Sequence, residues 1–241
     1  GINAEYGEQL MEAQPDFECD AYKFYGTMED GKPVDGKIVF TKNEANVQTF
    51  EGKITSVDGF FVTGNGSLYR NYKTLKGKIE NSKILSGSKE CHICTEVGNF
   101  DDQEQLTGEG VRTNLNNHSQ KGIFESGVFK KGSFQYKNCT AEGNFNEEGL
   151  PEGQCIITFE DGAKFDGLVN NGVKISGVYT FRNGDVYTGS YKNGIKNDDK
   201  CIYVIKGERY EGSIIDDGMA GEGTYLGVKA VWREGKLVYT K

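Results

Sequence analysis

The residues best suited to chemistry are a Cys-x-x-Cys pair, Cys91 and Cys94, with His92 between them. Two thiolates at this spacing can bind zinc, but a structural zinc site needs four ligands, which usually include a second such pair. The sequence contains no second Cys-x-x-Cys. If both cysteines lie in one strand, they point to opposite faces, and a redox pair would instead need a helix start in a βαβ unit. We therefore expect two ordinary thiols, with no metal and no cofactor.

Groups for acid–base or nucleophilic catalysis are scarce. His92 and His118 are the only histidines, which leaves little material for a Ser-His or Cys-His pair. Carboxylates are plentiful, but they cluster in pairs such as Asp101-Asp102 and Asp216-Asp217, where Asp suits a turn for conformational reasons. The sequence therefore predicts a protein that is not an enzyme.

The composition narrows the classes of partner. The formal net charge is −8, and Lys and Arg form no run of four or more, which argues against nucleic acid and disfavours an anionic membrane surface. No apolar run approaches the roughly 18 residues that a membrane helix needs. The six cysteines do not form a dense disulfide pattern, so we expect reduced thiols and an intracellular location.

Glycine is the unusual component, with 34 of 241 residues, beside 14 Phe and 13 Tyr. Glycines recur 21 to 26 residues apart, and five of them end an aromatic-x-Gly triplet such as Tyr187-Thr188-Gly189. The nine are Gly26, Gly52, Gly77, Gly98, Gly122, Gly143, Gly167, Gly189 and Gly212. The second residue after each is apolar or aromatic: Met28, Ile54, Ile79, Phe100, Phe124, Phe145, Val169, Tyr191 and Ile214. Alternate apolar positions predict a strand with one buried face.

Turn signals follow each of these strands. Six of them are Asp30-Gly31, Asp58-Gly59, Glu148-Gly149, Asn171-Gly172, Asn193-Gly194 and Asp217-Gly218. Asn-Gly and Asp-Gly favour the turn that closes a β-hairpin, and a second strand follows. The sequence thus predicts an all-β fold: an elongated, twisted, single-layer antiparallel sheet of about nine successive hairpins. Cys155, Tyr179 and Cys201 each stand twelve residues after a repeat glycine, which predicts one shared strand position.

One unit, Tyr210-Glu211-Gly212 through Gly221-Glu222-Gly223-Thr224-Tyr225, resembles the repeat of the MORN family, and the resemblance extends over about residues 22–240. It implies single-layer curved sheets of hairpins that serve as scaffolds, dimerisation rods, membrane-apposition modules or non-catalytic arms. The pattern is weak between 75 and 120, where Glu96 and Gln120 take the aromatic position and Lys89 and Arg112 an otherwise apolar one. This stretch is either sequence drift or a site that kinks the sheet or makes a specific contact.

Three parts are expected along the chain. Residues 1–21 form an N-terminal arm or cap, with helix formers over 5–13; residues 22–227 form the repeats; and residues 228–241 form a capping strand or hairpin around Glu234-Gly235. Such caps are needed because open sheet edges pair with other chains.

The aromatic rows are the candidate functional surface. They are interpreted either as packing or as partner-binding positions: Phe50, Phe100, Phe124, Phe145, Phe165, Tyr187, Tyr191, Tyr210 and Tyr225. The leading hypothesis is a structural or adaptor subunit that binds other protein subunits, in a cytoskeletal or ciliary assembly, with a homodimer possible. One alternative is a phospholipid head-group module, for which Lys130-Lys131 with Lys137 is the most basic patch, and another is carbohydrate binding.

Overall fold

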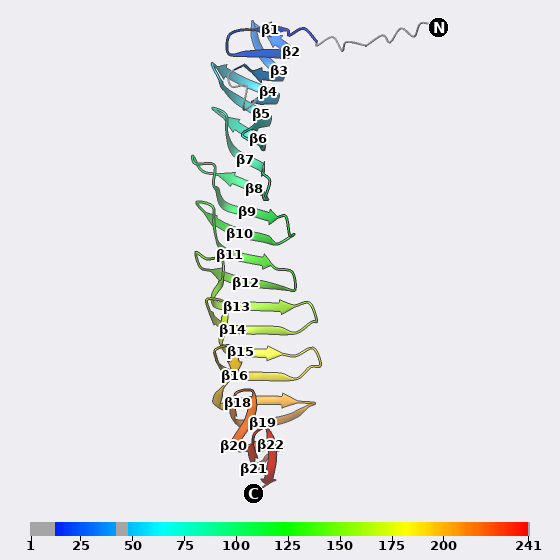
Figure 1. The fold of residues 1–241 in the computed structure, drawn as a ribbon, viewed down its shortest axis with the longest axis vertical. Helices are drawn as coiled ribbons and strands as arrows, with labels where there is room; N and C mark the ends of the chain where they lie inside the picture. Colours follow the sequence, from blue (N-terminus) through cyan, green and yellow to red (C-terminus); the bar gives the residue numbers. More distant parts are fainter. Residues whose placement is uncertain (1–12, 42–47, 241) are drawn as a thin grey trace, which may run out of the picture. The chain divides into compact units, whose positions relative to one another are not determined.

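The computed structural model describes residues 13–41 and 48–240, with the side chains of 239 and 240 left out. Within these residues the chain is all-β without a helix, and 22 antiparallel strands form an open sheet of successive hairpins (Figure 1). The predicted fold class is therefore confirmed. The helix formers over 5–13 fall outside the described residues, apart from Ala13, which is irregular.

The chain divides into two compact units. Unit 1 comprises residues 1–92 with 102–104, and unit 2 comprises residues 93–101 with 105–241. The strands of unit 1 are β1 (Phe17–Glu18), β2 (Tyr22–Glu29), β3 (Lys32–Phe40), β4 (Thr49–Asp58), β5 (Phe61–Arg70), β6 (Lys73–Glu80) and β7 (Lys83–Glu90).

Unit 2 holds the remaining strands. They are β8 (Cys94–Phe100), β9 (Leu106–Asn114), β10 (Ser119–Glu125), β11 (Val128–Gln135), β12 (Cys139–Phe145), β13 (Pro151–Phe159), β14 (Lys164–Asn170), β15 (Val173–Thr180), β16 (Val186–Lys192), β17 (Ile195–Lys196), β18 (Asp198–Ile205), β19 (Glu208–Ile215), β20 (Gly218–Tyr225), β21 (Val228–Arg233) and β22 (Lys236–Thr240). The last two strands form a hairpin around Glu234-Gly235, in the stretch where a cap was expected.

The hairpin turns follow the predicted chemistry, with two shifts in register. Asn171-Gly172 and Asn193-Gly194 have positive φ at both positions (47° and 74°, 52° and 76°), as a type I′ turn requires. The turn predicted at Asp58-Gly59 lies at Gly59 and Phe60, because β4 extends through Asp58. The turn predicted at Asp217-Gly218 lies at Asp216-Asp217, since both aspartates take positive φ and Gly218 begins β20.

The repeat glycines face one another across neighbouring strands and form a continuous row in each unit. In unit 1 the row is Gly26, Gly36, Gly52, Gly66, Gly77 and Gly87. In unit 2 it runs through Gly98, Gly110, Gly122, Gly132, Gly143, Cys155, Gly167, Gly177 and Gly189, then through Cys201, Gly212, Gly223 and Ala230. Only small residues occupy it.

The row explains why the motif is aromatic-x-Gly. A Cβ added at Gly167 would lie 2.2 Å from the carbonyl oxygen of Ser176 and 2.8 Å from the ring of Phe165. The aromatic ring therefore lies against the glycine two residues later, on the same face of the strand. The same contact occurs at two other glycines. A Cβ added at Gly189 would lie 2.6 Å from the hydroxyl oxygen of Tyr187, and one added at Gly212 would lie 2.6 Å from that of Tyr210. The core is built from these rings and from the apolar residue two positions after seven of the nine repeat glycines; Met28 and Tyr191 are only half-buried.

One predicted alignment is wrong. Cys155 pairs with Gly167 and Cys201 with Gly212, so both stand in the glycine row. Tyr179 instead pairs with Phe165, in the neighbouring aromatic row. The reason is where extra residues are inserted. The hairpin that contains Tyr179 has a two-residue turn, whereas a five-residue connection precedes β13 and Cys155. Cys201 also follows a two-residue turn, but the chain is irregular between β17 and Cys201, and this irregularity shifts it.

Candidate functional site

The aromatic residues selected from the sequence lie mainly inside the fold. Seven of the nine are at most 6% exposed: Phe50, Phe100, Phe124, Phe145, Phe165, Tyr187 and Tyr210. Tyr191 and Tyr225 are half-buried. The seven buried rings have no surface to offer a partner in this conformation, and their burial is accounted for by packing within the chain.

Two buried tyrosines are also fixed by hydrogen bonds. The hydroxyl of Tyr187 donates to the carbonyl of Ser190, and that of Tyr210 to the carbonyl of Ser213, each at 2.6 Å. Burial raises the pKa of both phenols, that of Tyr210 to about 12. These residues are structural anchors for unit 2.

Three further partly accessible aromatic residues of unit 2 lie at or just after the ends of second strands of hairpins. Tyr136, Phe159 and Phe181 are half-buried and follow β11, end β13 and follow β15 respectively. They were not among the predicted site residues. The signal was in the second strands, where apolar residues alternate toward the turn, as in Tyr179-Thr180-Phe181. The sequence interpretation weighted the first strands, in which aromatic-x-Gly is more regular.

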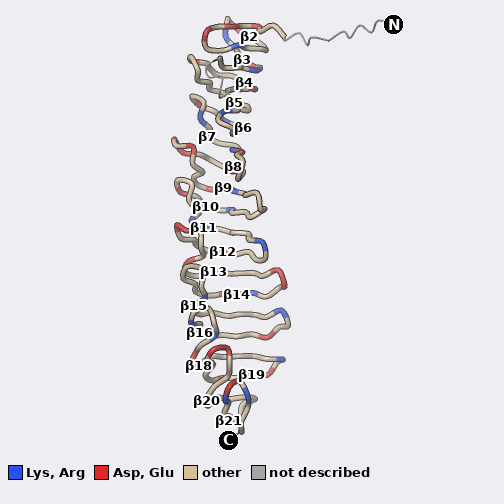
Figure 2. Tube along the Cα trace, in the orientation of Figure 1, with Lys and Arg blue, Asp and Glu red and all other residues tan. Residues whose placement is uncertain are grey.

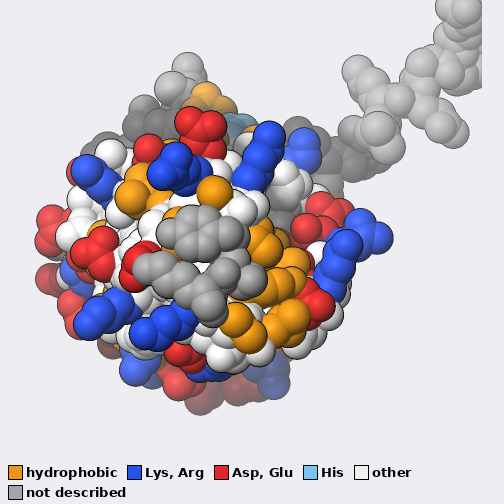
Figure 3. Space-filling view, turned by 90° about the horizontal axis from the view of Figure 1, so that it is seen from below, with side chains coloured by type: hydrophobic (Ala, Val, Ile, Leu, Met, Phe, Trp, Pro, Cys, Tyr) orange, Lys and Arg blue, Asp and Glu red, His pale blue; other side chains and the backbone are white. Residues whose placement is uncertain are grey.

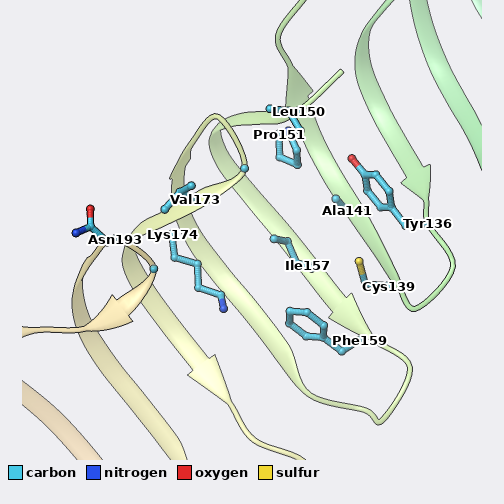
Figure 4. Close-up of a pocket in the computed structure, with 12 residues that line it drawn as sticks. Tyr136, Cys139, Ala141, Leu150, Pro151, Ile157, Phe159, Val173, Lys174 and Asn193 are labelled. Atoms are coloured by element: carbon cyan, nitrogen blue, oxygen red, sulfur yellow. The ribbon is translucent and has the colours of Figure 1, made fainter. Parts of the chain in front are cut away.

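Tyr136 and Phe159, but not Phe181, line a groove of about 490 Å³. Its lining is mostly apolar: Tyr136, Cys139, Ala141, Leu150, Pro151, Ile157, Phe159, Gly172, Val173, Lys174, Asn193 and Gly194. Figure 4 shows Ile157 and Phe159 on one strand facing the space that Lys174 enters from the next hairpin. Val173 (43% exposed) and the half-buried Leu150 form the opposite rim. The groove thus crosses several hairpins of unit 2.

The ammonium group of Lys174 lies among aromatic rings. Its Nζ is 5.7 Å from the ring centroids of Phe159, Phe165 and Tyr191 and 4.9 Å from that of Tyr179. Burial lowers the pKa of this amine and nearby Lys196 lowers it further. Cation–π attraction compensates part of the lost hydration.

Lys196 occupies the equivalent position in the next hairpin, with a different balance of charge. Its Nζ lies 5.3 to 5.9 Å from the rings of Phe181, Tyr187 and Tyr203. It also forms an ion pair with Asp217 at 2.9 Å. Tyr191 lies between the two lysine sites, and its buried hydroxyl has no hydrogen-bond partner among the described residues.

The stretch that departs from the repeat pattern is satisfied internally. Glu96, only 4% exposed, accepts from Nε and Nη2 of Arg112 at 2.8 and 2.6 Å. Arg112 also donates to the carbonyl of Gly127 at 2.7 Å and lies over the ring of Phe124. In unit 1, Lys89 donates to the carbonyl of Glu104, whose carboxylate pairs with Arg70.

The Cys-x-x-Cys pair does not lie in one strand, contrary to the sequence interpretation. Strand β7 ends at Glu90 and β8 begins at Cys94, so Cys91 belongs to the connection between them. The reason is that the repeat needs a turn at this point, and the pair spans it. All six cysteines are thiols. Among residues 13–41 and 48–240, no group of three His, Cys, Asp or Glu side chains is placed to hold a metal ion.

Comparison with protein-family models and with curated proteins gives no match for this chain. The resemblance to MORN repeats therefore depends on the residues and register described above, and it stays a prediction. Within the described ranges, no helix has the length and apolar character needed to cross a membrane.

Proposed function

We propose that this chain is a non-catalytic scaffold or adaptor that holds a segment of another protein in the groove of unit 2. The observation that supports the proposal is the accessible apolar lining around Tyr136, Phe159 and Val173, beside a core that is already closed. Aromatic side chains that are partly exposed and rigidly supported are typical anchors for protein partners. A MORN-like repeat array in a cytoskeletal or ciliary assembly fits this role.

The groove's polar groups favour binding over catalysis. Burial raises the pKa of the Cys139 thiol and that of Tyr136, the latter to about 12. Both groups are therefore protonated at neutral pH, and a protonated thiol is a poor nucleophile.

Affinity purification of the tagged chain from its native cells, followed by mass spectrometry, tests the proposal. We expect stoichiometric partner proteins that are lost from Phe159→Ser and Val173→Ser variants whose circular dichroism is unchanged, because both residues line the groove. Tyr72→Ser is the matched control, because Tyr72 is 63% exposed in unit 1. Partners that bind all three variants alike, or a chain that purifies alone as a monomer by light scattering, would exclude the groove as the binding surface.

No specific observation favours the lipid alternative over protein binding. Lys131 and Lys137 are exposed, but Figure 2 shows Lys and Arg interspersed with Asp and Glu at the turns of unit 2. Figure 3, viewed from the β22 end, likewise shows side chains of both charges around the nearest rim. Flotation with anionic liposomes tests lipid binding, and a glycan array tests carbohydrate binding by the half-buried rings. Strong binding in either would displace the scaffold proposal.

A further inference from the structure

On the basis of the proposed function, we infer that the groove of unit 2 selects a partner segment that carries a carboxylate next to an apolar side chain, and that Lys174 binds the carboxylate. Three observations support this: the surroundings of Lys174, the contrast with Lys196, and a missing side chain at Gly194.

The ammonium of Lys174 has three donor hydrogens, and four aromatic rings lie around it. The charges of Lys196 and Asp217 also act on it, but the Asp217 carboxylate is paired with Lys196. None of the described residues accepts a hydrogen bond from it or pairs with it. An ammonium that is partly removed from water without an acceptor is unfavourable, and its lowered pKa agrees with that strain. An anion from outside the chain would relieve the strain, and Lys174 lines the groove where such an anion would enter.

Lys196 shows how the same arrangement is completed. Lys174 and Lys196 are each the second residue after a two-residue turn, in successive hairpins, and each lies against several rings. Lys196 has a carboxylate from the chain itself, because Asp217 in the turn of the following hairpin lies 2.9 Å away. The two sites therefore differ in whether a carboxylate forms an ion pair with the ammonium group.

The position equivalent to Asp217 beside Lys174 is Gly194. Each is the second residue of its turn, because Lys192 pairs with Ile195 as Ile215 pairs with Gly218. Gly194 has no side chain, and a Cβ built there meets only Val173, at 3.8 Å. The space that a carboxylate fills beside Lys196 is thus available beside Lys174, on the lining of the groove.

The apolar part of the ligand follows from the neighbouring surface. Leu150, Pro151 and Ile157 line the groove beside Lys174, and they suit a branched or aromatic side chain. Other carboxylates nearby are engaged elsewhere: Asp161 accepts from the backbone N–H of Ala163, and Asp217 pairs with Lys196. The groove therefore combines an apolar floor with an ammonium group that forms no ion pair with any described residue.

The test uses a phage-displayed library of random peptides selected against the full chain, with affinities then measured by fluorescence anisotropy. We expect enriched peptides to share an Asp or Glu at a fixed distance from a large apolar residue. Lys174→Met should weaken their binding about 10- to 100-fold, the range for a charge-assisted hydrogen bond. Gly194→Asp should weaken it similarly, because it supplies an internal carboxylate like that of Asp217. Lys164→Met, an exposed lysine on β14, is the control and should have no effect.

A double-mutant cycle keeps the inference testable if Lys174→Met folds poorly. Replacing the peptide's Glu by Gln should weaken binding to the natural chain but have little further effect on the Gly194→Asp variant. Peptides that bind equally to the natural chain and the Lys174→Met and Gly194→Asp variants, yet are lost with Phe159→Ser, would overturn the role of Lys174 and leave the proposed function intact. A library that enriches nothing, or only peptides insensitive to Phe159→Ser, would overturn both.

Discussion

Unit 2 fills the same register row in two ways. From β14 to β20 the row beside the glycines is aromatic throughout: Phe165, Tyr179, Tyr187, Tyr203, Tyr210 and Tyr225. From β8 to β10 the same row holds Glu96, Arg112 and Gln120. The first stretch buries rings against glycines, whereas the second buries an ion pair whose donors and acceptors satisfy one another.

The comparison shows that the same row can be filled by packed aromatic rings or by hydrogen-bonded charged side chains. Arg112 donates to Glu96, to the carbonyl of Gly127 and, at 3.5 Å, to Gln120, so its donors are largely used within the chain. In the aromatic stretch, by contrast, neither the Lys174 ammonium nor the Tyr191 hydroxyl has an ion-pair or hydrogen-bond partner among the residues that the structure describes. The stretch that follows the repeat pattern best is therefore the one with polar groups left for a partner.

The largest expected effect compares two glycines, one from each stretch, that differ in how closely backbone atoms approach them. At Gly167 a Cβ would lie 2.2 and 2.6 Å from backbone atoms of Ser176 and Gly177, so the strands must move apart. We expect Gly167→Ala to lower the free energy of unfolding by about 4 kcal/mol or more. Urea denaturation followed by circular dichroism measures the loss.

Substitutions at two other glycines provide comparisons for the loss of stability expected from Gly167→Ala. At Gly110, in the polar stretch, the closest atoms are Val97 O at 2.9 Å and methyl groups of Leu106 at 3.0 and 3.1 Å, and side-chain atoms can yield. Gly110→Ala should cost about 1–2 kcal/mol. At Gly218 the nearest atom is 3.5 Å away, so Gly218→Ala should change stability by less than about 0.5 kcal/mol. Equal losses at Gly167 and Gly110 would show that the closer backbone contact at Gly167 does not determine the cost.

The next effect concerns the buried ion pair. Glu96→Leu leaves the Arg112 guanidinium, whose side chain is 26% exposed, without its carboxylate. We expect a loss of about 3 kcal/mol in the free energy of unfolding, because an uncompensated buried charge is costly. Chemical denaturation of the purified variant measures it.

The double variant Glu96→Leu/Arg112→Leu separates charge from packing. It should recover to within about 1 kcal/mol of the natural chain, because two apolar residues can replace a buried pair. Glu109→Leu, at an exposed position of β9, serves as the control for adding an apolar residue. If the double variant is less stable than Glu96→Leu alone, the polar stretch depends on Arg112 itself rather than on a balanced pair.

The fold was predictable because its signal is local and repeated. Aromatic-x-Gly places a ring over a glycine, and Asn-Gly favours a type I′ turn, each within a few residues. Nine recurring glycines, five of them in aromatic-x-Gly triplets, reinforce the register. The candidate site was predicted less well. Burial of Phe165 and Tyr187 depends on how sharply neighbouring strands approach at the glycines, and the sequence does not state that distance. The alignment of Tyr179 with the two buried cysteines depended on where extra residues are inserted, and the Lys174 site depends on Gly194 in another hairpin, a relation that becomes visible only once the register is known.

A smaller effect distinguishes the two stretches at alkaline pH. Burial raises the pKa of Tyr210 to about 12 from 10.0, whereas the equivalent Gln120 has no titratable group. Between about pH 10 and 12 the unfolded chain loses this proton while the folded chain keeps it, so stability falls as pH rises, by about 1.4 kcal/mol per pH unit for one such tyrosine.

We expect Tyr210→Phe to cost about 1 kcal/mol at pH 7 and to flatten this decline in stability. Urea denaturation at a series of pH values tests it, with Tyr69→Phe, at a 39% exposed position, as control. Equal slopes for all three proteins would contradict the buried, protonated phenol.

The smallest effect leaves stability unchanged and reports on the closed row through cysteine reactivity. Cys155 and Cys201 are buried members of the glycine row, and burial raises the pKa of both thiols, that of Cys201 to about 11. Because the thiolate is the reactive form, maleimide at pH 8 should modify Cys201 at least about 10-fold more slowly than the half-buried Cys19, which lies outside the row. Mass spectrometry of tryptic peptides over time measures both rates, and in concentrated urea the rates should converge. Rapid native modification of Cys201 would mean that the row opens readily in the aromatic stretch, and the Gly167→Ala loss should then shrink toward that of Gly110→Ala.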